Sequence, residues 1–194
     1  FQRSYRTLKI GNKSMITKIK QGTPAAEKSE LDAQVRHTVE KIINDIEQTG
    51  EEAVRGYSSQ FDNWSPKNLR LNDSEIQNCI NALDKQTLED INFAQTQIRR
   101  FAHIQLMSLQ DVEVETLPGI VLGHKNIPVN AVGCYVPGGK YPMVASAHMS
   151  VLTAKCAGVK RVIACTPPFE GKPEPAVIAA MALGGADELS LIHI

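Results

Sequence analysis

A short apolar segment that ends in a glycine turn places the strongest limit on how this chain can fold. Residues 131–136 are mostly apolar, and Pro137-Gly138-Gly139-Lys140 follows them directly, ahead of a segment rich in small residues. An apolar strand, a glycine turn and a helix in that order are typical of a parallel α/β sheet. Because such a turn brings backbone N–H groups to the start of a helix, it suits a phosphate or another anion. Residues 137–140 are therefore a candidate ligand loop.

The sequence after this loop continues to alternate between helix and strand patterns. Small residues predict a helix near 146–157, an apolar run predicts a strand at 161–166, and a second helix to residue 183 precedes a final strand. Nearly continuous apolar runs are expected of parallel strands that are covered on both faces. The fold prediction is α/β, in which a helical N-terminal layer and a β-hairpin lead into a βαβαβ parallel sheet.

The residues before the loop divide into an arm, a helical part and a hairpin. We expect residues 1–22 to form an N-terminal arm, 23–130 the helical and hairpin part of the first domain, and 131–194 a truncated βαβαβ domain. Apolar spacing predicts helices at 24–49, after an N-cap at Thr23, and at 51–62 and 73–83, and a long helix that begins at a cap at Thr87. Residues 112–117 alternate at period two, and Pro118-Gly119 supplies a turn before 120–122, so we expect a hairpin there.

The amino-acid composition limits the kinds of molecule that this chain is expected to bind. With 42% hydrophobic and 22% charged residues, the 194-residue chain can bury a core, and its 21 basic residues balance its 21 acidic ones. This balance gives no attraction to nucleic acid or to an anionic membrane. The sequence shows no apolar run long enough to span a bilayer and no signal peptide. Its four cysteines have no paired spacing, which favours free thiols in the cytoplasm: Cys79, Cys134, Cys156 and Cys165.

The residues alone do not decide the chemistry of the loop. The G-x-G-x-x-G spacing, a paired carboxylate, an H-E-x-x-H motif and a nucleophile elbow are all missing from the sequence. Tyr135 suits either the core or a stacked nucleotide, and Lys140 suits either the surface or an anion. His148 fits a core residue, a surface residue or a ligand, in that order. Residue types therefore indicate an α/β domain with a candidate anion or nucleotide loop.

Several motifs in a fixed order resemble the histidinol dehydrogenase family. They run over about residues 30–188, and they are Tyr57-Ser58 with Phe61-Asp62, Phe101 with Gln105, Glu115-Thr116-Leu117-Pro118-Gly119, Gly133 to Gly139 with Pro142 and Met149, Ala154 to Gly158, and Cys165-Thr166-Pro167-Pro168. The resemblance implies a homodimeric enzyme of paired, incomplete Rossmann-like domains. It also implies NAD and zinc as cofactors, and the oxidation of a primary alcohol to a carboxylate in two hydride transfers.

The resemblance assigns roles to the residues of the loop. Tyr135 falls on the family's nucleotide-contacting tyrosine, so Tyr135, Pro137, Gly138 and Gly139 are expected to contact the cofactor. The resemblance makes residues 131–194 a truncated, incomplete Rossmann-like domain that binds NAD. The family's zinc ligands and acid–base residues fall beyond residue 194. We therefore expect an N-terminal fragment that is inactive alone and holds no catalytic metal, and whose residues 189–194 depart from the family pattern.

Departures from the family pattern concern the substrate. Lys140-Tyr141 replaces a pair of small residues, and His148 replaces a leucine. Cationic and hydrogen-bonding groups suit a small anionic substrate, and the surrounding sequence resembles the sulfopropanediol dehydrogenase branch of the family. Expected substrate contacts are Lys140, Tyr141, His148 and His124. Histidinol itself is the alternative substrate, and a non-catalytic nucleotide-binding or oligomerisation module is the alternative class.

Overall fold

The computed structural model describes residue 22 and residues 25–138 and 141–192. The chain divides into two units, residues 1–50 and 51–194. The first unit contains α1 (Ala25–Thr49), which ends where Gly50 takes a φ of 61° and donates its N–H to the Ile46 carbonyl at 2.8 Å. A glycine tolerates this left-handed conformation without steric cost, so it ends the helix at the predicted place.

A parallel three-stranded sheet forms the centre of the second unit. Its order is β3 (Ala131–Tyr135), β4 (Arg161–Thr166) and β5 (Glu188–Leu191). The first crossover contains α5 (Val144–Ala147), a π-helical turn η1 (His148–Leu152) and α6 (Thr153–Cys156), and the second contains α7 (Pro175–Gly184). The order of strands and helices confirms the predicted α/β fold.

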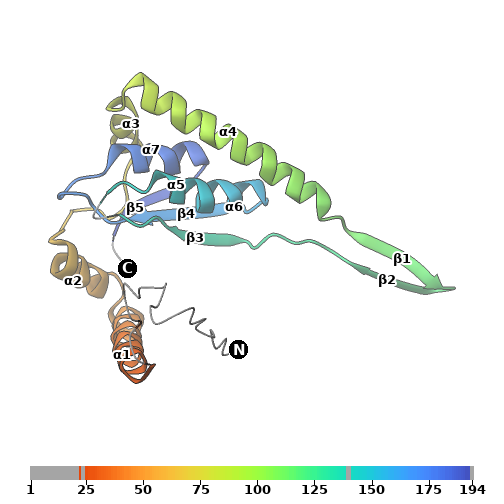
Figure 1. Cartoon of the computed structure of the whole chain (residues 1–194), viewed down its shortest axis with the longest axis horizontal. Coiled ribbons are helices and arrows are strands. Elements are labelled where there is room, and N and C mark those ends of the chain that lie inside the picture. The colour runs from red at the N-terminus through yellow and green to blue at the C-terminus, as the bar shows by residue number, and fades with distance from the viewer. Residues whose placement is uncertain (1–21, 23–24, 139–140, 193–194) are drawn as a thin grey trace, which may run out of the picture. The chain divides into compact units, whose positions relative to one another are not determined.

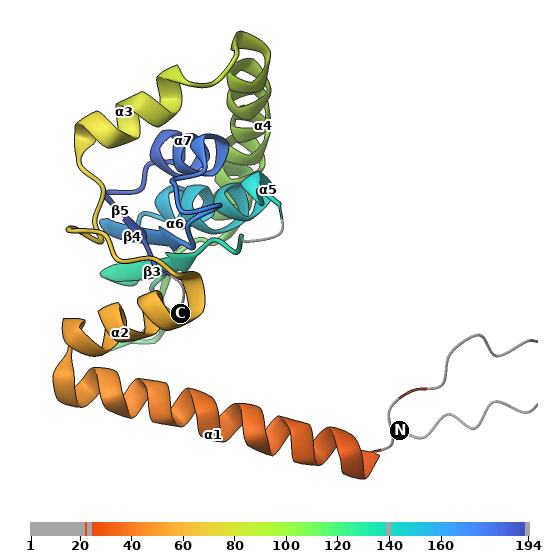
Figure 2. The same cartoon turned by 90° about the vertical axis from the view of Figure 1, so that its left-hand side faces the viewer.

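The hydrophobic core lies between the sheet and the helices on one side of it. On β4 the burial alternates, and Val162, Ala164 and Thr166 point into this layer. Helix α7 is buried nearly all round, because α3, α4, α5 and η1 all pack against it (Figures 1 and 2). The other face of β4 is only half-buried at Ile163 and Cys165, so the described residues cover the sheet unequally.

Three helices precede the sheet within this unit: α2 (Glu51–Asp62), α3 (Asp73–Asn81) and α4 (Lys85–Ser108). Helix α3 begins with a reciprocal capping box, in which Asn72 accepts from the Glu75 N–H and Glu75 accepts from the Asn72 N–H. The predicted cap of α4 at Thr87 is wrong. Asp84 is the cap, and Thr87 donates to it through both its N–H and its hydroxyl, at 2.9 and 2.7 Å.

A β-hairpin follows α4 and lies beyond the amino end of β3 (Figure 1). It pairs β1 (Val112–Leu117) with β2 (Ile120–His124) and turns through Gly119 at a φ of 81°. All of its residues are exposed, and a two-stranded hairpin is only marginally stable alone in water. The hairpin at 112–122 is confirmed, with two more residues on its second strand.

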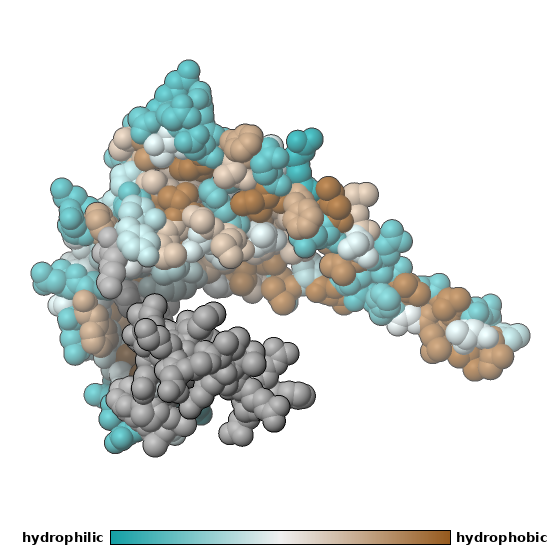
Figure 3. All heavy atoms as spheres, viewed as in Figure 1, coloured by the Kyte–Doolittle hydropathy of each residue, from teal (hydrophilic) through white to brown (hydrophobic). Residues whose placement is uncertain are grey.

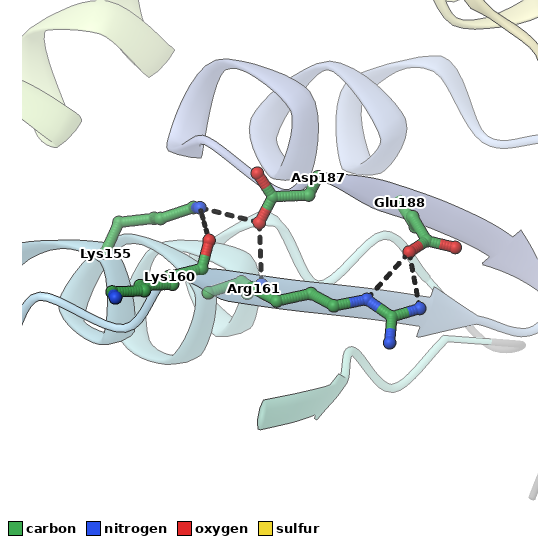
Figure 4. A network of polar contacts seen from close by, with 6 residues as sticks. Lys155, Lys160, Arg161, Asp187 and Glu188 are labelled. Carbon is green, nitrogen blue, oxygen red and sulfur yellow. Dashed lines mark hydrogen bonds and ion pairs between the residues drawn. The ribbon is translucent and has the colours of Figure 1, made fainter. Parts of the chain in front are cut away.

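Hydrogen bonds between residues far apart in the sequence fix the outer edge of the sheet and its amino end. Arg70 bridges to Ser190 in the antiparallel sense, so residues 69–71 cover the free edge of β5. At the amino end, Asp187 accepts from Lys155 Nζ at 2.6 Å and from the Val162 N–H at 2.7 Å (Figure 4). The hydrogen bond from Lys155 is the main reason that the pKa of Asp187 is lowered. This carboxylate ties the starts of β4 and β5 to α6.

None of the helices in the part of the chain that the structure describes is both long and apolar enough to cross a membrane.

Candidate nucleotide-binding site

Two loops meet at the carboxyl end of the sheet. Val136 donates its N–H to the Cys165 carbonyl at 2.8 Å, which continues the pairing of β3 and β4 one residue past β3. The loop after β3 then passes close to the loop after β4: a Cβ on Gly138 would lie 3.2 Å from Pro167 Cγ and 3.6 Å from Thr166 Oγ1. A side chain at Gly138 would therefore press against Pro167, whereas Gly139 and Lys140 lie outside the described residues.

The surface between these loops and the start of α7 forms a shallow depression. Its lining comes from two separate stretches of the sequence, the loop after β3 and the segment from the end of β4 to the start of α7: Gly138, Tyr141, Pro142, Thr166, Pro167, Phe169, Glu174 and Val177. Glu174 caps α7 by accepting from the Val177 N–H at 2.8 Å. Tyr141 is exposed at the rim, so of the four predicted substrate contacts only Tyr141 is placed at this depression by the described residues.

Tyr135 ends β3 and points to the face of the sheet opposite the helical layer. In the parallel register it pairs with Cys165, whereas Cys134 pairs with Ala164 on the buried face. Its side chain is 39% exposed. Burial raises the pKa of Tyr135, and Cys165 and Asp62 raise it further, so the phenol keeps its proton. Tyr135 thus offers a partly exposed ring and a hydroxyl beside the loop, as a nucleotide contact requires.

His148 lies away from the depression. It is only 5% exposed within η1, and burial lowers its pKa, with a smaller contribution from Arg99. Arg99 bonds the Leu183 carbonyl at 2.9 Å and Gln95 Oε1 at 3.3 Å, so His148 belongs to a polar group between α4, η1 and α7. Nothing in the sequence indicated the π-helical turn, which adds one residue to the turn that carries His148.

His124 also lies away from the depression. It ends β2, where its Nε2 lies 3.0 Å from the Gln110 carbonyl at the base of the hairpin. The hairpin extends from the amino end of β3, whereas the ligand loop follows the carboxyl end (Figure 1). The structure therefore does not bring His124 and Tyr141 together.

The end of α2 supplies polar and aromatic groups that the residue-by-residue reasoning did not select. The rings of Tyr57 and Phe61 stack with centroids 5.6 Å apart and planes 9° apart. Asp62 follows Phe61 in the sequence, and its charge helps to raise the pKa of Tyr135. In the sequence, only the place of this segment among the family motifs indicated a functional role.

The described residues contain no group of three or more histidine, cysteine, aspartate or glutamate side chains that could hold a metal ion. All four cysteines are free. Burial raises the pKa of Cys79, Cys134 and Cys165, so these thiols stay protonated. No chemical step through zinc can be assigned to this part of the chain.

The arrangement defines a class of protein. A glycine loop and a partly exposed tyrosine at the carboxyl ends of parallel strands are typical of α/β domains that bind a nucleotide or a similar ligand. A family model described as histidinol dehydrogenase matches residues 25–192, and the chain therefore belongs to the histidinol dehydrogenase family. Residues 189–192, which were expected to depart from the family, lie in or next to β5 and within this match.

Individual relatives agree with this assignment. The chain is 54% identical to a "histidinol dehydrogenase homolog" of Shouchella clausii, over 92% of the chain and 42% of the relative. It is 42% identical to a sulfopropanediol 3-dehydrogenase of Ruegeria pomeroyi, over 81% of the chain and 36% of that protein. It is 35% identical to a histidinol dehydrogenase of Methanosarcina barkeri, over 80% and 36%.

A solved structure shares the fold. The crystal structure of histidinol dehydrogenase from Elizabethkingia anophelis superposes with a TM-score of 0.75 at 25% identity, and the match covers 82% of this chain and 36% of that one. The chain thus spans between 36% and 42% of the length of these relatives.

Proposed function

We propose that this chain is the N-terminal part of an NAD-linked, zinc-dependent dehydrogenase that oxidises a primary alcohol to a carboxylate. The observation that carries the proposal is the place of Tyr135, partly exposed at the carboxyl end of β3 beside a loop in which Gly138 lies close to Pro167. Tyr135, Pro137, Gly138 and Gly139 contact the cofactor in this proposal. Family membership supports it, because the matching family consists of dehydrogenases.

Each of these residues has a physical role in holding a nucleotide. The ring of Tyr135 packs against a flat group of the cofactor, while its protonated hydroxyl donates a hydrogen bond. Gly138 lets the loop backbone approach closely, and Pro137 fixes the exit of the chain from β3. When bound, NAD accepts the hydride and zinc polarises the alcohol oxygen. In our proposal the zinc ligands and acid–base residues belong to the part of the relatives that this chain does not span.

For the substrate, we propose a small anionic alcohol such as a dihydroxypropanesulfonate. Similarity to the sulfopropanediol 3-dehydrogenase of Ruegeria pomeroyi supports it, and Lys140 and Tyr141 supply a cation and a donor at the loop. His124 and His148 are left out, because their side chains lie elsewhere in the structure. Histidinol is the second candidate, since relatives named histidinol dehydrogenase are 33–38% identical.

Turnover by the complete enzyme tests the substrate. We expect kcat/KM for dihydroxypropanesulfonate to exceed that for histidinol at least tenfold, because the Lys140 ammonium attracts a sulfonate and repels a cationic amine. Formation of NADH is followed with each alcohol at one ionic strength. A higher kcat/KM for histidinol would contradict the sulfonate assignment and leave the dehydrogenase proposal standing.

We further propose that the complete enzyme is a homodimer whose partner covers the hairpin and one face of α4. Exposed apolar side chains follow both elements (Figure 3), and they are Phe93, Phe101, Ile104 and Met107 on one face of α4, and Val112, Val114, Leu117, Ile120, Val121 and Leu122 on the hairpin. A contiguous apolar surface of this kind marks an interface in soluble proteins. A hairpin with every residue exposed also needs a partner for stability.

A paired substitution tests this interface. Val114 and Leu122 are directly opposite in the hairpin, so the double variant Val114→Lys with Leu122→Glu keeps a cross-strand attraction while it removes apolar surface. We expect the complete enzyme to sediment as a monomer in this form and as a dimer with the control Glu113→Gln, which leaves the apolar positions untouched. A double variant that remains dimeric would rule out the hairpin as the interface.

A further inference from the structure

Several buried polar atoms at the end of α2 lack hydrogen-bond partners. Among the described residues, the buried side-chain atoms without a partner include Ser58 Oγ, Asp62 Oδ2 and Trp64 Nε1. An unpaired buried polar atom costs about 1–3 kcal/mol, so native structures contain few of them. Three within seven consecutive residues indicate a place that a ligand or ordered water completes.

The end of α2 brings these atoms to one side of the helix. Ser58 and Asp62 are four residues apart and therefore share a helix face. The helix stops at Asn63, which takes a φ of 50°, and Trp64 donates its N–H back to the Ser58 carbonyl at 3.2 Å. This turn folds the indole of Trp64 against the hydrophobic core. Ser58 is 1% exposed, so its hydroxyl points into the protein.

This side of α2 faces the sheet surface that carries Tyr135. Helix α2 lies on the opposite side of the sheet from α5, α6 and α7 (Figures 1 and 2). Tyr135 and Cys165 point to the same face, and both Cys165 and Asp62 act electrostatically on Tyr135. Asp62, which carries one of the unpaired atoms, therefore borders the proposed cofactor contact, on the far side of the sheet from His148.

We propose that Asp62, together with Ser58 and Trp64, binds the vicinal hydroxyls of a ribose of the nucleotide that Tyr135 contacts. This inference rests on the proposed function. A carboxylate accepts two hydroxyl protons, an indole N–H donates to a sugar oxygen, and a serine hydroxyl does either. A phosphate does not fit this set, because the carboxylate repels it. The sugar thus lies at the end of α2, and the loop at 137–140 is left for the remaining parts of the nucleotide.

Binding measurements on the 194-residue chain test the inference. AMP and nicotinamide mononucleotide are titrated separately, so that the two arms show which ribose is bound. Binding is followed by calorimetry and by the fluorescence of Trp64, the only tryptophan in the chain. We expect Asp62→Asn to weaken binding of one mononucleotide by about tenfold or more, because a hydrogen bond to a charged group is lost. The control Asp90→Asn, on exposed α4 surface, should bind as the unmodified chain does.

A 2′-deoxy analogue of that mononucleotide isolates the hydroxyl contact. The unmodified chain should bind the analogue roughly tenfold more weakly than the ribonucleotide, whereas Asp62→Asn should bind the two almost equally. Thermal unfolding supplies a second readout. Because Asp62 Oδ2 has no partner within the described residues, the isosteric Asp62→Asn change should leave the melting temperature unchanged or raise it.

The outcomes separate this inference from the proposed function. If Tyr135→Ala abolishes nucleotide binding and Asp62→Asn leaves it unchanged, the ribose contact is wrong and the cofactor site stands. If Asp62→Asn lowers the melting temperature without a change in affinity, the polar atoms belong to a hydrated structural contact. If the unmodified chain binds neither mononucleotide, or if Tyr135→Ala binds as well as the unmodified chain, the proposed cofactor site fails and the ribose contact fails with it.

Discussion

Replacing Ile178 with alanine is expected to lower the free energy of unfolding by about 3–4 kcal/mol, the largest stability effect that we predict for a single site. The side chain is fully buried in α7, and α3, α4, α5 and η1 pack around that helix. Because elements from both crossovers and from the N-terminal helices meet there, the cavity cannot close by the movement of one element. Chemical denaturation of the 194-residue chain measures the effect as a lower midpoint with an unchanged slope.

Two comparison variants show whether burial is the cause. Ile178→Val removes one methylene and should cost about 1 kcal/mol. Ile127→Ala, at a position 81% exposed, should change the free energy of unfolding by less than about 0.5 kcal/mol. Equal losses at Ile178 and Ile127 would contradict the assignment of α7 to the core.

Local patterns predicted most of the second unit. The apolar runs at 131–136 and 161–166 correctly predicted β3 and β4. A short apolar run of this kind is expected of a strand that is buried in a parallel sheet. The cap of α4 was misplaced by three residues, since Thr87 has cap-like neighbours and hydrogen-bonds the true cap, Asp84. Sequence pattern does not distinguish the cap from the residue that donates to it.

The site was only partly predictable from sequence. The loop and Tyr135 could be selected because a strand end, a glycine turn and a family motif coincide in consecutive residues. The roles proposed for Asp62 and Trp64 depend on a left-handed residue at Asn63, after which the Trp64 N–H donates back to the Ser58 carbonyl. Asp62 and Trp64 are both far from Tyr135 in the sequence, and only the tertiary fold brings the end of α2 close to Tyr135. His148 is the opposite case: it is close to the loop in the sequence, but the fold buries it away from the depression.

Replacing Tyr135 with alanine is expected to weaken nucleotide binding by about 30-fold or more, the largest functional effect that we predict. An aromatic ring at a binding site contributes about 1–3 kcal/mol by stacking, and the lost hydroxyl adds the cost of one hydrogen bond. Tyr135→Phe keeps the ring and should therefore lose only about three- to tenfold. Since the side chain is already 39% exposed, neither change should destabilise the fold as Ile178→Ala does.

The central claim is that the carboxyl end of β3 holds a nucleotide cofactor, and calorimetric titration of NAD into the 194-residue chain and its Tyr135→Ala variant tests it most directly. The account predicts saturable binding to the unmodified chain, weaker binding to Tyr135→Phe, and a further large loss in Tyr135→Ala. Equal affinities of the unmodified chain and Tyr135→Ala would contradict it.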